Sequence, residues 1–318
     1  MSAARENQAA MIIHEVGPRD GLQMESGVVP LEKKEAWLRG LMAAGLDIVQ
    51  VGSFVHPVKV PQMADTDELF RRLTAGKKPA PVLSGLVLNE KGLERGLACG
   101  VEMFCLGASA SETHSRKNTG MGTEEAAQRI IGAAKAAVAA GKKVQVSVQS
   151  AFGCGFEGAI PEERVLNMVR AYLEAGLRNI SLADTAGHAH PAQVERLFGA
   201  VFRLDPGVEC ACHFHNTYGL GMANIFAARR AGVTSFETSF AGLGGCPFTK
   251  VAAGNVATED FVHALHLEGL RKDVDLGRLI TVARDVAAHF GREMQGYVYK
   301  TGQGIGARVE SGGQKENV

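Results

Sequence analysis

A glycine that separates an alanine-rich helical pattern from a short β-branched run recurs five times along this chain of 318 residues. The five glycines are Gly45, Gly100, Gly141, Gly176 and Gly232. A glycine just past a helix end adopts the left-handed conformation at little cost, and the next residues then begin a strand. The repeat indicates regular alternation of helix and strand, which favours parallel strands joined by right-handed crossovers.

Eight strands are predicted when the sequence is followed outward from these junctions. They lie at residues 11–16, 48–52, 82–87, 101–106, 144–148, 179–182, 210–214 and 235–239, with helices at 32–44, 124–140, 162–175, 191–203 and 218–231. Eight parallel strands close a (β/α)8 TIM barrel, which is the fold we expect. The competing architecture is a doubly wound open sheet. It is disfavoured because the first turn, at 17–21, lacks the G-x-G-x-x-G phosphate fingerprint.

The remainder of the chain adds helices rather than a second domain. Two further helices are predicted at 258–267 and 276–289, and no linker separates them from the barrel. Since α/β barrels commonly use about 200–250 residues as one unit, we expect a single domain. Its barrel covers about 11–268, a C-terminal helical extension about 269–301, and a flexible tail 302–318.

The composition of the chain indicates which kind of molecule it binds. The chain has 34 basic and 34 acidic residues and no long basic run, which argues against a nucleic-acid or membrane-surface role. No stretch approaches about 18 apolar residues, and the polar start has no secretory core. The six cysteines form no C-x-x-C pattern and are interpreted as reduced thiols. We therefore expect a cytoplasmic protein that binds a small molecule.

Reactive groups of a barrel of this kind lie at the carboxyl ends of its strands. Arg19 and Asp20 follow the first strand, and His213 and His215 share one face of the seventh. With Asn255 they give a mixed nitrogen and oxygen set, which favours Mg²⁺ or Mn²⁺. A surface ion pair in a turn and a pair of core histidines are the simpler alternatives. The H-x-H at 188–190 has the same spacing, but it lies in a loop and is the weaker candidate.

Four further positions could carry chemistry. Cys246 is a thiol on a glycine-rich loop after the eighth strand. Asp184 ends the sixth strand, where an active-site carboxylate and a turn cap are equally good interpretations. Gln145 lies on the inward face of the fifth strand, where polar residues alternate with valines of the opposite face. Gln50 lies in the middle of the second strand.

Long colinear blocks of this sequence resemble the 3-hydroxy-3-methylglutaryl-CoA lyase family of metal-dependent barrel lyases. The blocks are VGPRDGLQ at 16–23, GSFV at 52–55 with VPQM at 60–63, SLADT at 181–185, HFHNTYG at 213–219, GLGGCP at 242–247 and GNVATED at 254–260. The resemblance implies a divalent cation, Mg²⁺ or Mn²⁺, bound by Asp20, His213, His215 and Asn255.

The resemblance also implies a reaction, the retro-Claisen cleavage of an acyl-CoA. The 3-hydroxyl group loses its proton, the C2–C3 bond breaks, and an acetyl-CoA enolate forms beside a keto acid such as acetoacetate. Arg19 would polarise the thioester oxygen, His213 would carry the proton, and Cys246 would act as an acid on a closing flap. Asp184 completes the catalytic candidates.

The sequence departs from the family at three charged positions, one of which is Asn216, where the family has Asp. Gln50 stands where the lyases usually have Glu, and Gln145 where they have Arg, so both charges are replaced by amides. These two residues, with Gln23 and Asn118, are our candidates for substrate specificity.

Other functions stay open at this point. An aldolase on a free hydroxy-keto acid would use the same barrel, and so would a Claisen-type acyl transferase, although only about 80 residues follow the eighth strand here. A ligand-binding barrel without turnover is the non-enzyme alternative. By analogy with related barrels we expect a homodimer, with the apolar helix at 276–290 as its interface.

Overall fold

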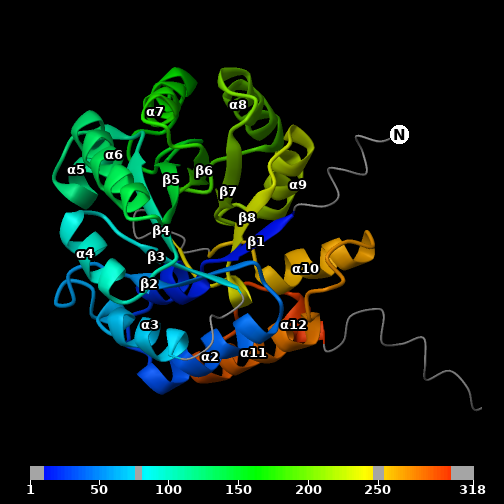
Figure 1. Cartoon of the computed structure of the whole chain (residues 1–318). Coiled ribbons are helices and arrows are strands. Elements are labelled where there is room, and N and C mark those ends of the chain that lie inside the picture. Colours follow the sequence, from blue (N-terminus) through cyan, green and yellow to red (C-terminus); the bar gives the residue numbers. More distant parts are fainter. Residues whose placement is uncertain (1–10, 76–80, 246–253, 302–318) are drawn as a thin grey trace, which may run out of the picture.

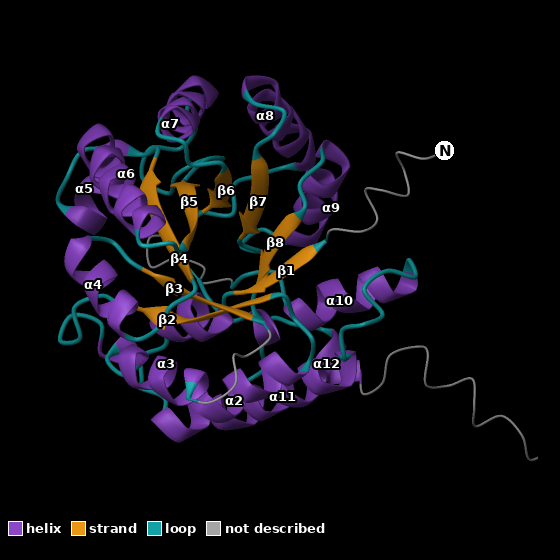
Figure 2. Cartoon of the chain, viewed as in Figure 1, coloured by secondary structure: helices purple, strands orange, loops and turns teal. Residues whose placement is uncertain are grey.

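In the computed structural model, which describes residues 11–75, 81–245 and 254–301, eight parallel strands close into a barrel. Its strands are β1 (Ile12–Glu15), β2 (Ile48–Ser53), β3 (Val82–Leu86), β4 (Met103–Ser109), β5 (Lys143–Gln149), β6 (Asn179–Asp184), β7 (Glu209–Phe214) and β8 (Ser235–Thr238). Each strand pairs with its sequence neighbours, and β8 pairs with β1. Figures 1 and 2 show the strands at the centre, surrounded by helices. The predicted TIM barrel is confirmed.

The junction glycines behave as the sequence indicates. All five have positive φ, from 73° at Gly141 to 107° at Gly232. The strand predicted at 101–106 begins two residues later, at Met103. The delay arises because the Val101 amide still donates to the Gly96 carbonyl, 3.1 Å away, and so closes the preceding helix instead of starting the sheet.

Eleven α-helices are found in the described part of the chain. They are α2 (Leu31–Ala43), α3 (Thr66–Thr74), α4 (Glu90–Ala98), α5 (Glu112–Thr119), α6 (Thr123–Ala139), α7 (Glu162–Glu174), α8 (Pro191–Leu204), α9 (Gly221–Ala231), α10 (Thr258–Leu267), α11 (Leu276–Phe290) and α12 (Val298–Thr301). Of these, α3, α4 and α5 were not predicted. Helix α4 contains two glycines, which lower helix propensity, but a Cβ at Gly96 would lie 2.5 Å from the Phe104 ring, so packing requires a small residue there.

The C-terminal helices pack against the start of the chain. Figure 1 shows α11 beside α2 and α12, and the Trp37 ring of α2 lies 6.0 Å from the Phe240 ring and 6.3 Å from that of Phe290. Leu279 and Val286 of α11 are buried within the chain. The apolar side of α11 is thus covered by the chain itself, which removes the basis for expecting a dimer interface there. None of the described helices is long and apolar enough to cross a membrane.

Candidate active site

A tight π-helical turn, Gly17–Gly21, carries the Arg–Asp pair directly after β1. A Cβ at Gly17 would lie 2.5 Å from Ser239 Oγ and 2.6 Å from the Phe240 ring, so only glycine fits. Beneath the turn, buried Glu15 Oε1 accepts hydrogen bonds from the amides of Gly17 (2.7 Å) and Phe240 (3.0 Å). Glu15 therefore ties the turn to the segment that follows β8.

Strand alternation directs both histidines of β7 into the barrel, where each is about 95% buried (exposed fractions 6% for His213 and 5% for His215). His213 Nδ1 lies 3.0 Å from Glu237 Oε2, on the neighbouring strand β8. His215 Nδ1 lies 2.9 Å from the backbone carbonyl of Thr185. Both partners are pure acceptors, so each Nδ1 carries a hydrogen, and in a neutral ring the lone pair is on Nε2.

Those two lone pairs converge on one point. The Nε2 atoms of His213 and His215 are 3.2 Å apart. Asp20 Oδ2 lies 3.5 Å from His215 Nε2 and 3.8 Å from His213 Nε2. Three electron-rich atoms this close repel one another unless a proton or a metal ion lies among them, and their spacing suits a metal ion. The residues present therefore fit a divalent cation.

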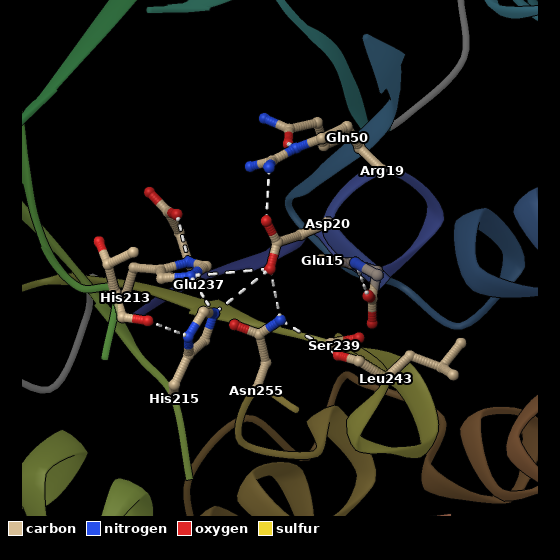
Figure 3. Close-up of polar contacts among 12 residues, drawn as sticks. Glu15, Arg19, Asp20, Gln50, His213, His215, Glu237, Ser239, Leu243 and Asn255 are labelled. Atoms are coloured by element: carbon tan, nitrogen blue, oxygen red, sulfur yellow. Dashed lines mark hydrogen bonds and ion pairs between the residues drawn. The ribbon is translucent and has the colours of Figure 1, made fainter. Parts of the chain in front are cut away.

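Asn255 completes this cluster from the loop after β8 (Figure 3). Its Nδ2 donates to Asp20 Oδ2 (2.8 Å) and to the Leu243 carbonyl (3.1 Å). Its Oδ1 is buried and has no hydrogen-bond partner among the described residues. A buried amide oxygen without a donor is costly, and amide oxygens are ligands that hard cations prefer.

Arg19 lies above the cluster, held by two acceptors (Figure 3). Its Nε donates to Gln50 Oε1 and its Nη1 to Asp20 Oδ1, each at 2.5 Å. Burial alone would raise the pKa of Asp20, but Arg19 and the two histidines hold it well below its usual range. For His213 the effect of burial has the opposite sign. Burial alone would lower the pKa of this imidazole, but the hydrogen bond to Glu237 and the charge of Asp20 raise it.

A cavity of about 210 Å³ opens on these residues. It is lined by Arg19, Asp20, His213 and His215, and by all four specificity candidates, Gln23, Gln50, Asn118 and Gln145. The structure therefore brings these eight predicted residues together around one cavity. Gly245 also lines it, whereas Cys246 and the rest of its loop to residue 253 lie outside the described residues.

Asp184 caps the turn after β6 and does not face the cavity that a catalytic carboxylate would have to reach. Its two oxygens accept hydrogen bonds from the backbone amides of His188 (2.8 Å) and Ala189 (3.0 Å), and it is not among the described residues that line the cavity. Burial raises the pKa of this carboxyl. The geometry favours the turn-cap interpretation over the catalytic one. His190 occupies the N-cap position of α8 without a side-chain capping hydrogen bond, and it is not part of the cluster of Asp20, His213 and His215.

Sequence reasoning missed Glu237, the partner of His213. A signal was available, because alternation along Ser235–Thr238 places Phe236 outward and Glu237 inward. A lone acidic residue in a short strand inside a barrel is unusual unless it is paired. It also missed Glu15, which lies on the opposite face of the sheet from Glu237 and accepts hydrogen bonds from the Thr258 hydroxyl and the Phe240 amide.

The fold and this cluster define a barrel enzyme with a two-histidine, one-carboxylate site. Comparison with known proteins identifies the family to which this enzyme belongs. The HMGL-like family model matches residues 10–286. A hydroxymethylglutaryl-CoA lyase of Bacillus subtilis is 36% identical over 89% of this chain and 94% of its own length.

A relative from Pseudomonas aeruginosa, named 3-hydroxy-3-isohexenylglutaryl-CoA/hydroxymethylglutaryl-CoA lyase, is 36% identical over 87% of this chain and 92% of its own. The structure of an HMG-CoA lyase from Acinetobacter baumannii, solved with coenzyme A and 3-methylmalate, superposes with a TM-score of 0.86. It is 35% identical and covers 93% of this chain and 96% of its own. The chain belongs to the HMGL-like family and is a carbon–carbon lyase.

Proposed function

We propose that the protein cleaves 3-hydroxy-3-methylglutaryl-CoA, or an ester with a different 3-substituent, to acetyl-CoA and a keto acid such as acetoacetate. Relatives that bear this activity in their names cover nearly the whole chain. The observation that carries the proposal is the convergence of two histidine lone pairs and the Asp20 carboxylate, with the Arg19 guanidinium bound to the same carboxylate.

Asp20, His213 and His215 would hold Mg²⁺ or Mn²⁺, with the Asn255 amide oxygen as a further ligand. A divalent cation at this position lowers the pKa of the substrate's 3-hydroxyl group and polarises its oxygen. Glu237 fixes the orientation of the His213 ring, so that Nε2 faces inward.

Arg19 supplies the second positive charge of the site. Negative charge develops on the thioester oxygen as the C2–C3 bond breaks, and a preorganised guanidinium beside that oxygen stabilises it. Gln50 accepts from Arg19 Nε and so orients the side chain. A neutral amide in that place leaves the charge of Arg19 offset by Asp20 alone among the hydrogen-bond partners described here.

The enolate must then be protonated at C2, and we keep Cys246 as the acid for this step. The support is its place in the sequence, directly after Gly245, which lines the cavity. His213 would carry the proton that leaves the 3-hydroxyl group. Asp184 is retained only as a residue that positions the loop after β6.

We also propose that the protein is cytoplasmic. The five described cysteines are free thiols, which suits the reducing cytoplasm. A homodimer is proposed by analogy with related barrels, and light scattering of the purified protein tests it. We also propose that residues 11–301 form a single domain, because α11 and α12 pack on the barrel instead of apart from it.

The test is product release from 3-hydroxy-3-methylglutaryl-CoA in the presence of Mn²⁺. Equal amounts of acetyl-CoA and acetoacetate are expected, and Cys246→Ser should lower the rate while leaving Mn²⁺ binding unchanged. If the protein instead cleaves the free hydroxy acid as fast as its CoA ester, it is an aldolase of the same barrel type and the proposal is wrong.

A further inference from the structure

The floor of the cavity is formed by residues from the beginnings of strands. The third residue of each strand lies on the inner side of the barrel, and five of these residues line the cavity: Gln50, Cys105, Gln145, Ser181 and Glu237. Asp20 and His215, by contrast, follow the ends of β1 and β7. The cavity therefore has a mouth with the candidate metal ligands and a floor one layer deeper.

This floor lacks a cation. Glu237 is its one ionised side chain, and that carboxylate is already bonded to His213. Burial raises the pKa of Cys105 to about 12, so the thiol is neutral. The remaining three residues are amides and a hydroxyl. The Arg19 guanidinium touches this floor only through Gln50 Oε1 (2.5 Å) among the described hydrogen bonds, and it is also bonded to Asp20 Oδ1, so at Gln145 the acyl group meets a hydrogen-bonding amide and no positively charged floor side chain.

One of those groups is an unused donor. Gln145 is 3% exposed. Its Oε1 accepts from the Cys105 thiol (Sγ to Oε1, 3.7 Å), which sets the direction of the amide. Its Nε2 is buried and has no hydrogen-bond partner among the described residues. A buried donor without an acceptor is unfavourable, and a ligand oxygen would satisfy it.

The direction of substrate entry follows from size. The five floor residues are all buried, so the bulky coenzyme A stays at the mouth. The reacting carbons then lie beside Arg19 and the histidines, and the end of the acyl group distant from the sulfur points to the floor.

We propose that Gln145 is a specificity-determining residue whose Nε2 donates a hydrogen bond to an oxygen at the distal end of the acyl group. Recognition at this end depends on a hydrogen bond instead of a charge pair. The site therefore accepts 3-hydroxyacyl-CoA esters that end in an uncharged carboxamide or ester as well as those that end in a carboxylate. This inference rests on the proposed function, because it assumes an acyl-CoA in the cavity.

Binding of three unreactive CoA thioesters tests the inference. All three lack the 3-hydroxyl group and so cannot be cleaved: 3-methylglutaryl-CoA, its terminal carboxamide, and a chain of the same length ending in methyl. Calorimetry with the Mn²⁺-loaded wild type should give dissociation constants for the carboxylate and carboxamide within about threefold, and a methyl-terminated ester about 5- to 10-fold weaker.

Two variants separate recognition from a structural role. Gln145→Met should weaken both oxygen-bearing esters about 5- to 10-fold and leave the methyl-terminated ester within twofold. Gln145→Glu should weaken the carboxylate ester at least about tenfold by like-charge repulsion and spare the carboxamide. Gln193→Met is the matched control, because the Gln193 amide donates to the Phe152 carbonyl and neither is among the described residues that line the cavity.

Equal weakening of all three esters by Gln145→Met would overturn the inference, and so would a wild type that binds the carboxylate more than tenfold better than the carboxamide. Failure of the proposed function is a separate result, since it appears as no acetyl-CoA from 3-hydroxy-3-methylglutaryl-CoA while these dissociation constants remain measurable.

Discussion

Substitution of Glu237 should weaken metal binding even though this residue is not itself a ligand. Its Oε2 lies 3.0 Å from His213 Nδ1, and its side chain is about nine-tenths buried. The carboxylate keeps the hydrogen on Nδ1 and makes Nε2 a stronger base. We expect Glu237→Gln and Glu237→Ala to lower the affinity for Mn²⁺ to different extents.

The magnitudes follow from what each variant retains. Glutamine has the same shape and its Oε1 still accepts from Nδ1, so only the charge is lost. Removal of an acceptor behind a ligating histidine costs about 10- to 100-fold in metal affinity. Glu237→Gln should lie near the lower end, about 1.4 kcal/mol, and Glu237→Ala near the upper end, about 2.7 kcal/mol, because it leaves Nδ1 without a partner.

The assay is calorimetric titration of metal-free protein with Mn²⁺, alongside the rate of acetyl-CoA release. The matched control is Glu268→Gln, which removes a carboxylate from a half-exposed ion pair with Arg229, and it should behave as wild type. If Glu237→Ala binds Mn²⁺ with wild-type affinity, the reasoning about His213 is wrong.

Two further substitutions probe charge. Arg19→Met should lower kcat/KM by about 10²- to 10³-fold, because it removes a positive charge beside the enolate oxygen. It should not weaken Mn²⁺ binding, because the repulsion between Arg19 and the cation is relieved. Initial rates and calorimetry measure the two effects, and weaker Mn²⁺ binding would contradict the prediction. Burial raises the pKa of Glu259 from 4.5 to about 8, so its stabilising contribution is present below the unfolded pKa and is lost as pH rises toward 8, at about 1.4 kcal/mol per pH unit. Glu259→Gln should therefore flatten the decline in unfolding free energy between pH 6.5 and 8 in urea titrations; an unchanged slope would show that Glu259 does not titrate there.

Much of the fold could be predicted because it is signalled locally. A left-handed glycine after α2, α4, α6, α7 and α9 marks the approach to the next strand, and all five of these glycines have the predicted positive φ. Helices α4 and α5 were not predicted because the helix propensity of their sequences is low. Gly92 and Gly96 weaken α4, and α5 is polar throughout, with Ser111 as its N-cap. Contacts made only in the folded barrel stabilise them.

The candidate site shows the same division. Asp20, His213 and His215 could be found because strand ends and strand alternation fix their direction without knowledge of the partners. Glu237 meets His213 only through the register of β7 against β8, in which the two residues are paired across 24 positions of sequence. The orphan amide of Gln145 likewise depends on its neighbour across β4 and β5, Cys105. Such pairings require the closed barrel.

The central claim is that Asp20, His213 and His215 hold the cation on which cleavage depends. Its most direct test is a Mn²⁺ titration of EDTA-treated protein that follows occupancy and acetyl-CoA release from 3-hydroxy-3-methylglutaryl-CoA together. We expect one site per chain, activity that rises in step with its occupancy, and loss of both in Asp20→Asn. Full turnover by the metal-free protein, or normal Mn²⁺ binding by Asp20→Asn, would contradict the account.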